Sequence, residues 1–362
     1  MKILWLIDNL GSGGAQRQLI NLAIMLKKNR CDVSILCYND SDFFAEILDK
    51  ENIKIHWEIE KNYIKRIFAI RSFIRKGNYD VVISFLEVPN FLACFSAIGG
   101  RNWNLITNEL SAKLATFTSI RGKIFSWFIR YSDTHVCNSN NAKEMWVKYY
   151  PQYKNKLNVI YNPIILPSIT SVYFPKRNGK LHIVIAASYQ YLKNPIGVVK
   201  ALILMTDDER NKIKISWYGR KDVTNGDMRA YEETMNLIKK NNLEDIIFLN
   251  EPTKDIANRM NEADFVGLFS ELEGLPNAIC EGMMLGKPII MTKVSDYTRL
   301  VDNKNGFLCE WDKPESIKNA FVTAMNLSGE EIMQMGKNSK EKGKLLFSKE
   351  KIAEQWINII SR

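Results

Sequence analysis

Short apolar runs separated by amphipathic helical stretches recur along the whole chain. Lys2–Ile7 and residues 33–38 and 80–85 have the length of buried strands, and residues 17–29 place their apolar side chains on one helical face. The same alternation restarts at residues 182–187. Since alternating strands and helices favour parallel sheets, the pattern predicts an α/β protein with two doubly wound parallel sheets.

The two series are separated by an irregular segment that contains prolines and ends near residue 179. A chain of 362 residues also exceeds what one hydrophobic core usually serves. We therefore expect two domains, with the boundary placed after residue 165.

The most informative stretch is residues 270–288, which lies between two apolar runs of strand length. Asn277–Leu285 reads as a helix of apolar and small residues that carries one acid, Glu281, with Asn277 one turn earlier on the same face. Glu273 follows the first of the two strands, at the edge where open parallel sheets bind ligands. A buried carboxylate requires a partner. The stretch therefore predicts a site for a ligand with several hydroxyls and a negative group.

The loop after the first strand holds Gly11, Gly13 and Gly14. Glycines at such a turn let backbone N–H groups approach a phosphate or a sugar closely. The dinucleotide fingerprint requires a further glycine where this chain has Gln16, so nicotinamide binding and oxidoreductase activity are disfavoured.

Composition adds a bias toward anionic partners. Lys and Arg exceed Asp and Glu by 50 to 40, which gives a formal charge of +10. The three histidines are scattered and form no zinc motif, so we expect no metal. The six cysteines show no close pairing, which fits reduced thiols in a cytoplasm. The first apolar run is too short for a signal peptide, and residues 81–98 are too interrupted to span a membrane.

Two stretches of the first half, residues 61–76 and 113–131, combine basic residues with isoleucines and aromatic residues. Amphipathic helices of this kind bind anionic membrane surfaces, because apolar area and basic charge act together there. Packing of the same apolar side chains into the core is the alternative.

Several motifs together carry a family resemblance: GSGGAQRQLINLA, NVIYNP, LKNP, ELEGLPNAICE, GKPII and NGFLC. In this order they resemble retaining glycosyltransferases of family 4, which have the GT-B fold of two Rossmann-like domains. The final FSKEKIAEQWINII is similar to the helix that returns to the first domain in that family. The resemblance thus implies a first domain of residues 1–165 plus 347–362 and a second domain of residues 166–346.

The resemblance also implies roles for particular residues. Glu281 would bind the ribose hydroxyls of the nucleotide, and Glu273 would contact the donor sugar near the reacting carbon. Lys193 of LKNP matches the lysine that holds the donor diphosphate. The remaining expected donor-binding residues are Gly274, Leu275, Pro276 and Asn277, with Gly13 and Gly14 in the first loop.

The chain departs from the family pattern at two positions. The arginine that commonly stands five residues before the lysine is Ser188 here, and Arg220 is a candidate to supply that charge. The active-site histidine expected in the first domain is missing from TNELS, where Glu109 could orient the acceptor hydroxyl or act as a base. A surface glutamate in a salt bridge is the alternative for Glu109.

We therefore expect a retaining transferase that moves a sugar from a nucleotide sugar, in particular a UDP-sugar, to a lipid-linked or growing saccharide. The expected process is assembly of a cell-surface polysaccharide such as O-antigen or capsule. The expected location is the cytoplasm, peripheral on the inner membrane. We expect no nucleic-acid partner and no cofactor besides the nucleotide-sugar substrate. Two alternatives remain at this point: a nucleotide-sugar 2-epimerase of the same fold, and a non-catalytic nucleotide-sugar-binding protein.

Overall fold

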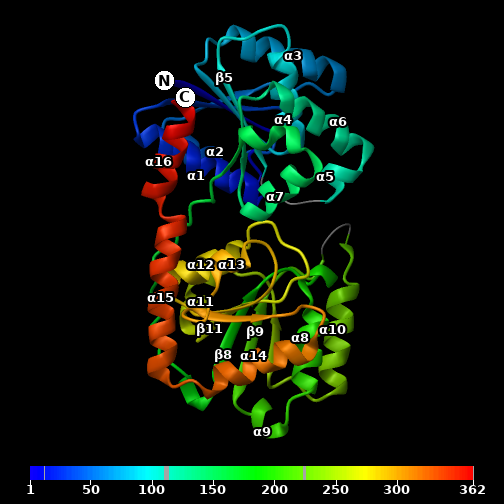
Figure 1. Cartoon of the computed structure of the whole chain (residues 1–362), viewed down its shortest axis with the longest axis vertical. Helices are drawn as coiled ribbons and strands as arrows, with labels where there is room; N and C mark the ends of the chain where they lie inside the picture. Colours follow the sequence, from blue (N-terminus) through cyan, green and yellow to red (C-terminus); the bar gives the residue numbers. More distant parts are fainter. Residues whose placement is uncertain (12, 110–113, 223–225, 362) are drawn as a thin grey trace. The chain divides into compact units, whose positions relative to one another are not determined.

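Two separate parallel sheets organise the chain. The computed structural model describes residues 1–11, 13–109, 114–222 and 226–361. It divides into unit 1, Met1–Pro163 with Lys349–Arg362, and unit 2, Ile164–Ser348 (Figure 1). Every strand pair that joins the described strands is parallel. The predicted fold class, two doubly wound parallel sheets, is confirmed.

The sheet of unit 1 has seven strands in the order β3-β2-β1-β4-β5-β6-β7. The strands are β1 Lys2–Ile7, β2 Asp32–Cys37, β3 Lys54–Trp57, β4 Val81–Phe85, β5 Asn104–Glu109, β6 Thr134–Cys137 and β7 Leu157–Val159. The central strand β1 is buried along Ile3–Ile7, because helices cover both faces of the sheet. Its apolar run therefore shows no alternation with polar residues.

The helices of unit 1 lie in two groups. They are α1 Gly14–Lys28, α2 Ala45–Lys50, α3 Tyr63–Lys76, α4 Glu87–Ala97, α5 Leu114–Thr118, α6 Ile120–Phe128, α7 Asn140–Tyr149 and α16 Lys349–Ile360. One group is built around α4, which contacts both α3 and α6, and the other contains α1, which contacts α16 (Figure 1). Trp356 of α16 is 1% exposed and packs its ring on Trp5 at 5.7 Å between centroids, which ties the end of the chain to β1.

The sheet of unit 2 has six strands in the order β10-β9-β8-β11-β12-β13. They are β8 Leu181–Ala186, β9 Ile213–Tyr218, β10 Ile247–Asn250, β11 Phe265–Leu268, β12 Ile289–Thr292 and β13 Gly306–Cys309. The direction of succession reverses between β8 and β11. In open α/β sheets this switch point is where ligands bind, outside the carboxyl ends of the strands.

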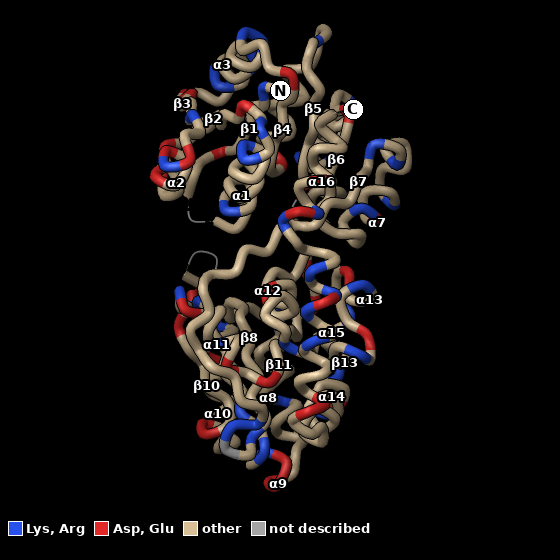
Figure 2. The backbone as a smooth tube through the Cα atoms, turned by 90° about the vertical axis from the view of Figure 1, so that its left-hand side faces the viewer, with Lys and Arg blue, Asp and Glu red and all other residues tan. Residues whose placement is uncertain are grey.

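Two groups of helices cover this second sheet. The helices are α8 Pro195–Ile203, α9 Asp207–Arg210, α10 Arg229–Lys240, α11 Ile256–Glu262, α12 Asn277–Leu285, α13 Tyr297–Leu300, α14 Pro314–Asn326 and α15 Gly329–Phe347. Helix α8 contacts α10 and α14 on one side, while α12 contacts α11 and α15 on the other (Figure 1). Figure 2 shows that charged residues follow the helices and loops and are sparse along the strands.

Helix α12 lies close to the sheet because it carries Gly282. A Cβ at that position would meet the Val266 side chain of β11 at 2.9 Å. On its outer side, a Cβ at Gly336 of α15 would meet the backbone oxygen of Gly286, which ends α12, at 2.3 Å. The helix that bears Glu281 is therefore held between β11 and α15 with little freedom to shift.

Some elements differ from the expectation. Helix α1 begins at Gly14 rather than at residue 17, since Gly13 is extended and forms the N-cap. Strand β3 was not expected: it has four residues, lies at the edge of the sheet and buries none of its side chains fully. Helix α12 has the predicted bounds, Asn277–Leu285.

Candidate functional site

Three loops of unit 2 meet at the switch point of its sheet. They follow β8, β9 and β11, which are neighbours in the order β9-β8-β11. A Cβ at Gly219, after β9, would meet the backbone oxygen of Ala187, after β8, at 1.9 Å. The loop after β11 joins them through Glu271, whose backbone N–H donates to the Leu192 carbonyl at 2.8 Å.

A charged pair links two of these loops. The Lys193 Nζ lies 2.6 Å from Glu273 Oε1, and the two side chains are 19% and 13% exposed. The Ser270 hydroxyl donates to the same carboxylate oxygen at 2.8 Å. Ser270 is in turn fixed by Thr292, whose hydroxyl donates to its carbonyl at 2.6 Å. The two residues are therefore held at the carboxyl edge of the sheet in defined orientations, yet remain reachable from solvent.

The turn that presents Lys193 is built by Asn194. This residue has φ 60°, and its side chain caps α8 by accepting a bond from the Gly197 N–H at 3.1 Å. Its amide nitrogen also donates to the Trp311 carbonyl at 2.7 Å. Asparagine tolerates the left-handed region better than most residues, so it suits this position directly after the lysine.

Residues 274–277 follow Glu273 at the same edge of the sheet and lead into α12. The Gly274 carbonyl accepts a bond from the Ser295 hydroxyl, Leu275 is buried, and Pro276 is the N-cap of α12. Asn277 is exposed in the first turn of this nine-residue helix. The N-terminus of a helix carries a partial positive charge of about half an elementary charge and attracts anions.

Glu281 lies one turn further along α12 and is partly buried. Its neighbour Cys280 is fully buried: burial first, and then the charges of Glu281 and Asp296, raise the pKa of its thiol well above the usual value. Cys280 therefore stays protonated and offers no thiolate for chemistry. Glu281 is the acid that α12 presents beside Asn277.

Arg220 lies next to the position that lacks the family arginine. Its backbone carbonyl accepts a bond from the Tyr189 N–H at 3.0 Å, directly after Ser188, and its side chain is exposed. The structure thus brings Arg220 to the loop that carries Lys193. No ion pair is formed by Arg220 among the described residues.

In unit 1, Gly13 and Gly14 differ in the space around them. A Cβ at Gly13 would meet the Gln16 side chain at 2.2 Å, because Gln16 folds back to donate to Asp8 at 3.1 Å. A Cβ at Gly14 would have no atom within 4 Å, so open space remains there.

Glu109 ends β5 and is 5% exposed. Its carbonyl accepts a bond from the Asn138 N–H at 3.2 Å. Burial, and next the charge of Glu109, raise the pKa of the Cys137 thiol on β6, which places the carboxylate near that strand. A glutamate this buried is not the surface residue of the alternative interpretation. Residues 110–113, the rest of the TNELS motif and the start of the following stretch, lie outside the described residues.

A neutral hydrogen-bond network lies beside Glu109 and was not expected. The Ser84 hydroxyl donates to Asn90 Oδ1 at 2.7 Å, and the Asn90 amide donates to the Asn108 carbonyl at 3.0 Å. All three residues are at most 3% exposed. Within the described part of the chain, Asn108 Oδ1 is buried without a hydrogen-bond partner. The network joins residues of β4, α4 and β5 that are up to 24 positions apart, so no local sequence pattern predicts it.

The turn between β4 and α4 is strained at the same edge. Leu86 has φ 81° and ψ 162°, a region that is essentially restricted to glycine. A leucine held there costs of order 1–3 kcal/mol, and such strain concentrates at functional sites. No sequence signal predicts it.

Comparison with known proteins identifies the family. Residues 12–166 match the family described as Glycosyltransferase Family 4, and residues 173–342 match Glycosyl transferases group 1. The chain belongs to glycosyltransferase family 4. The identification made from the sequence motifs is thus confirmed, and the chain is a glycosyltransferase.

Relatives of this family 4 glycosyltransferase match along nearly their whole length. An alpha-1,4-N-acetyl-D-galactosaminyltransferase of Campylobacter jejuni, named for a diNAcBac-PP-undecaprenol substrate, is 25% identical over 376 residues, covering 100% of this chain and 98% of the relative. The UDP-Gal:alpha-D-GlcNAc-diphosphoundecaprenol alpha-1,3-galactosyltransferase of Escherichia coli is 24% identical, covering 91% and 88%.

The fold of this family 4 glycosyltransferase is that of solved GT-B structures. Anabaena HepE in complex with UDP has a TM-score of 0.84 at 16% identity, covering 100% of both chains. The predicted GT-B fold is therefore confirmed. Among the residues that the structure describes, no helix is long and apolar enough to cross a membrane. No three His, Cys, Asp or Glu side chains in that same part of the chain are grouped to hold a metal ion.

Proposed function

We propose that the protein transfers a sugar from a UDP-sugar to a lipid-linked saccharide with retention of anomeric configuration. The observation that carries the proposal is the Lys193–Glu273 pair at the switch point of unit 2, 2.6 Å between charged atoms. The relatives support the substrate classes: one is named for UDP-Gal, and both are named for undecaprenol-linked saccharides.

The donor half of the reaction needs positive charge at the leaving group. When the bond between C1 of the sugar and the diphosphate oxygen breaks, UDP departs with the electron pair. Lys193 and the N-terminus of α12 then stabilise the charge that develops on the diphosphate. Glu273 holds the ammonium of Lys193 at the sheet edge beforehand, so little reorganisation is required. In this arrangement no metal is needed for that task.

Glu273 acts on the sugar, at the other end of the bond that breaks. Positive charge develops at C1 as the leaving group departs, and a carboxylate close to that carbon stabilises it. The bond from Ser270 keeps the carboxylate oriented. The backbone of residues 274–277 lines the sugar and phosphates, and Glu281 binds the ribose hydroxyls.

The acceptor half belongs to unit 1. The acceptor hydroxyl forms the new bond to C1 and loses its proton, and Glu109 is the candidate to orient it or to take the proton. The neighbouring network of Ser84, Asn90 and Asn108 supplies neutral groups that hold the edge of the sheet rigid.

The outer surface of α6 favours contact with an anionic membrane. Ile120, Ile124 and Trp127 are 81%, 51% and 45% exposed, and their spacing of four and three places them on one helical face. Arg121 and Arg130 stack on aromatic rings of this segment, at 5.2 Å from Phe125 and 4.3 Å from Trp127. Exposed apolar groups flanked by basic ones match the interface of a membrane with anionic headgroups.

Core packing accounts for the other aromatic residues of this stretch. Phe117 is 3% exposed, and the rings of Phe125 and Phe128 each lie 4.7 Å from that of Phe91 on α4. Of Phe117, Phe125, Trp127 and Phe128, only Trp127 is exposed.

Helix α3, which contacts α4, also exposes apolar side chains: Ile64 is 66% exposed and Phe68 is 58% exposed. The basic residues of α3 are blue in Figure 2. Two of its arginines serve the fold. Arg71 donates to the Phe95 and Ile98 carbonyls at 2.7 and 2.8 Å, and Arg75 donates to Gly100 at 2.9 Å. These bonds satisfy carbonyls at the C-terminal end of α4. We propose that α3 and α6 together rest on the membrane that holds the acceptor.

The transfer proposal is tested with the purified full-length chain. A panel of UDP-sugars is combined with undecaprenyl-diphosphate-linked saccharides, and products are detected by mass. The proposal expects a saccharide one residue longer, α-linked, formed equally well with EDTA present. Conversion of the nucleotide sugar without any acceptor would indicate an epimerase instead, and tight UDP binding without turnover on the whole panel would indicate a binding protein.

The membrane proposal is tested by sedimentation with phosphatidylcholine vesicles that contain or lack phosphatidylglycerol. We expect binding only to the anionic vesicles, weakened about tenfold by Ile124→Glu and also reduced by Trp127→Ala. Trp311→Ala is the matched control, since Trp311 is 39% exposed in unit 2. Equal binding of all variants would contradict the assignment of α6.

A further inference from the structure

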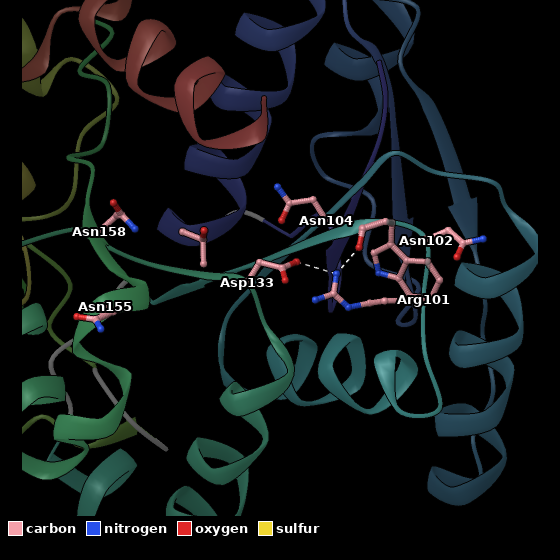
Figure 3. Close-up of a pocket in the computed structure, with 8 residues that line it drawn as sticks. Arg101, Asn102, Asn104, Asp133, Asn155 and Asn158 are labelled. Carbon is pink, nitrogen blue, oxygen red and sulfur yellow. Dashed lines mark hydrogen bonds and ion pairs between the residues drawn. The ribbon is translucent and has the colours of Figure 1, made fainter. Parts of the chain in front are cut away.

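A polar hollow lies at the opposite edge of the unit 1 sheet, where its strands begin. Residues 101–104 lead into β5, Asp133 and Thr134 into β6, and Asn155 and Asn158 flank the start of β7. Together they line a volume of ≈ 740 Å³ (Figure 3). A second hollow of ≈ 490 Å³ shares residues 101–103 with it. Both volumes lie in the range of about 300–1,000 Å³ that is usual for small-molecule sites.

The charged groups that line this hollow are paired with each other and with nearby backbone groups. Arg101 lies 2.7 Å from Asp133 and also donates to the carbonyls of Trp103 and Tyr131, the latter at 3.1 Å. Asp133 further accepts from the Leu105 N–H at 2.7 Å. Burial would raise the pKa of Asp133, but the bonds from Arg101 and Leu105 outweigh it and hold that pKa below its usual value. The carboxylate therefore stays ionised and neutralises the guanidinium.

Two neutral groups of the wall are left without partners. The indole N–H of Trp103 finds no acceptor among the described residues, although the side chain is only 9% exposed. Asn104 Oδ1 is likewise buried and accepts no bond from the described residues. Buried polar atoms without partners are uncommon and call for an explanation, such as a ligand. Here one donor and one acceptor are left, next to each other in the chain.

The remaining lining residues also carry amides. Figure 3 shows Asn155 and Asn158 on one side of the hollow, with Asn104 and Asp133 between them and Asn102. An amide offers two donors and an acceptor on one side chain, which matches the hydroxyl and acetamido groups of a sugar. An anion would favour a cation with uncommitted N–H groups, whereas the arginine here is paired with a carboxylate.

We propose that this hollow is an accessory, non-catalytic site for a neutral saccharide chain, with the exposed amides of Asn102 and Asn155 as its hydrogen-bonding groups and with Trp103 and Asn104 in its wall. The two adjoining hollows suit a ligand of more than one sugar residue. The site lies at the amino edge of the sheet, whereas Glu109 lies at the carboxyl edge. It therefore adds to the transfer proposal and does not depend on it.

The test is a titration of the ¹⁵N-labelled full chain, in which the indole N–H signal of Trp103 is followed. That signal is assigned by its loss in Trp103→Phe. Tri-N-acetylchitotriose and maltotriose are the probes, and inorganic phosphate is the anionic comparison. We expect a saturable shift of the Trp103 signal with at least one saccharide and none with phosphate.

Variants locate the binding. Asn102 and Asn155 are exposed, so Asn102→Ala/Asn155→Ala leaves the core intact, and we expect it to weaken the titration about tenfold. Asn319→Ala, an exposed asparagine of α14, is the control and should leave the affinity unchanged. A Trp103 signal that stays in place with both saccharides, that moves equally with phosphate, or that titrates identically in the double variant would overturn the proposal. Sugar transfer is measured separately, so failure here leaves the transfer proposal intact.

Discussion

At the carboxyl edge of the unit 2 sheet, an ammonium and a carboxylate meet 2.6 Å apart with 19% and 13% of their side chains exposed. At the carboxyl edge of the unit 1 sheet, the groups that meet are mostly neutral: the Ser84 hydroxyl and the amides of Asn90 and Asn108, all nearly inaccessible. Both edges belong to parallel sheets of the same kind. Their chemistry differs in the charge that each can offer.

Under the proposed function, the difference follows from the group that each edge would bind. A leaving diphosphate gains charge during the reaction, so fixed opposite charge near it lowers the barrier. An acceptor hydroxyl is neutral and requires position more than charge. A neutral network avoids the desolvation cost of buried ions.

Substitutions at the carboxyl edge of the unit 2 sheet should have the largest effect on the rate of transfer. Lys193→Met removes the cation that we propose faces the diphosphate, and we expect kcat/KM for transfer to fall about 10²- to 10³-fold. Lys200→Met is the matched control, since Lys200 is exposed on α8 and should change the rate by less than about twofold. Equal activity of the two variants would remove Lys193 from the site.

Glu273→Gln should lower kcat about 10²-fold, because the amide can still accept the bond from Ser270 but carries no charge. In combination with Lys193→Met, the loss should be clearly smaller than the product of the single losses, since the two residues act through one contact. Steady-state kinetics of the four proteins measure the coupling. Independent, fully multiplicative losses would show that the contact is not used in catalysis.

Substitutions in the network at the carboxyl edge of the unit 1 sheet should lower the stability of the protein. Asn90→Ala leaves the Ser84 hydroxyl and the Asn108 amide N–H without their partner, at a cost of about 1–3 kcal/mol. For a unit of this size, the thermal unfolding midpoint should fall by roughly 2–10 °C, measured by circular dichroism. Asn319→Ala should move it by no more than about 2 °C. An unchanged midpoint in Asn90→Ala would mean that the network does not stabilise unit 1.

The smallest expected effect concerns Arg220. Arg220→Met should raise KM for the UDP-sugar about fivefold at low salt and less at 0.5 M salt, because an exposed cation acts through a screened field. Arg177→Met is the control, since Arg177 is exposed and precedes β8, so it lies toward the amino edge. An effect of the same size in both variants would indicate general charge and not a substitute for the missing family arginine.

Much of the fold could be predicted from periodicity. Helix α12 has its predicted bounds because Pro276 and Gly286 delimit it in the sequence. Strand β3 escaped prediction because four half-exposed residues at a sheet edge leave no apolar run. The function of Arg71 and Arg75 could not be seen either, since the carbonyls they bond lie 21 to 27 residues away.

For the candidate site, the sequence pointed to Lys193 and Glu273 separately. Their contact joins residues 80 positions apart and depends on β8 and β11 being neighbours, which no local pattern contains. Ser270 and the Ser84–Asn90–Asn108 network were missed for the same reason. Strain at Leu86 is likewise a property of the folded backbone, and leucine gives no hint of it.

We propose that Lys193 holds the diphosphate and Glu281 the ribose, and calorimetric titration with UDP and with uridine separates these two roles. Lys193→Met should weaken UDP binding at least tenfold and leave uridine binding unchanged, whereas Glu281→Gln should weaken both ligands. UDP binding of wild-type strength in Lys193→Met would contradict the account.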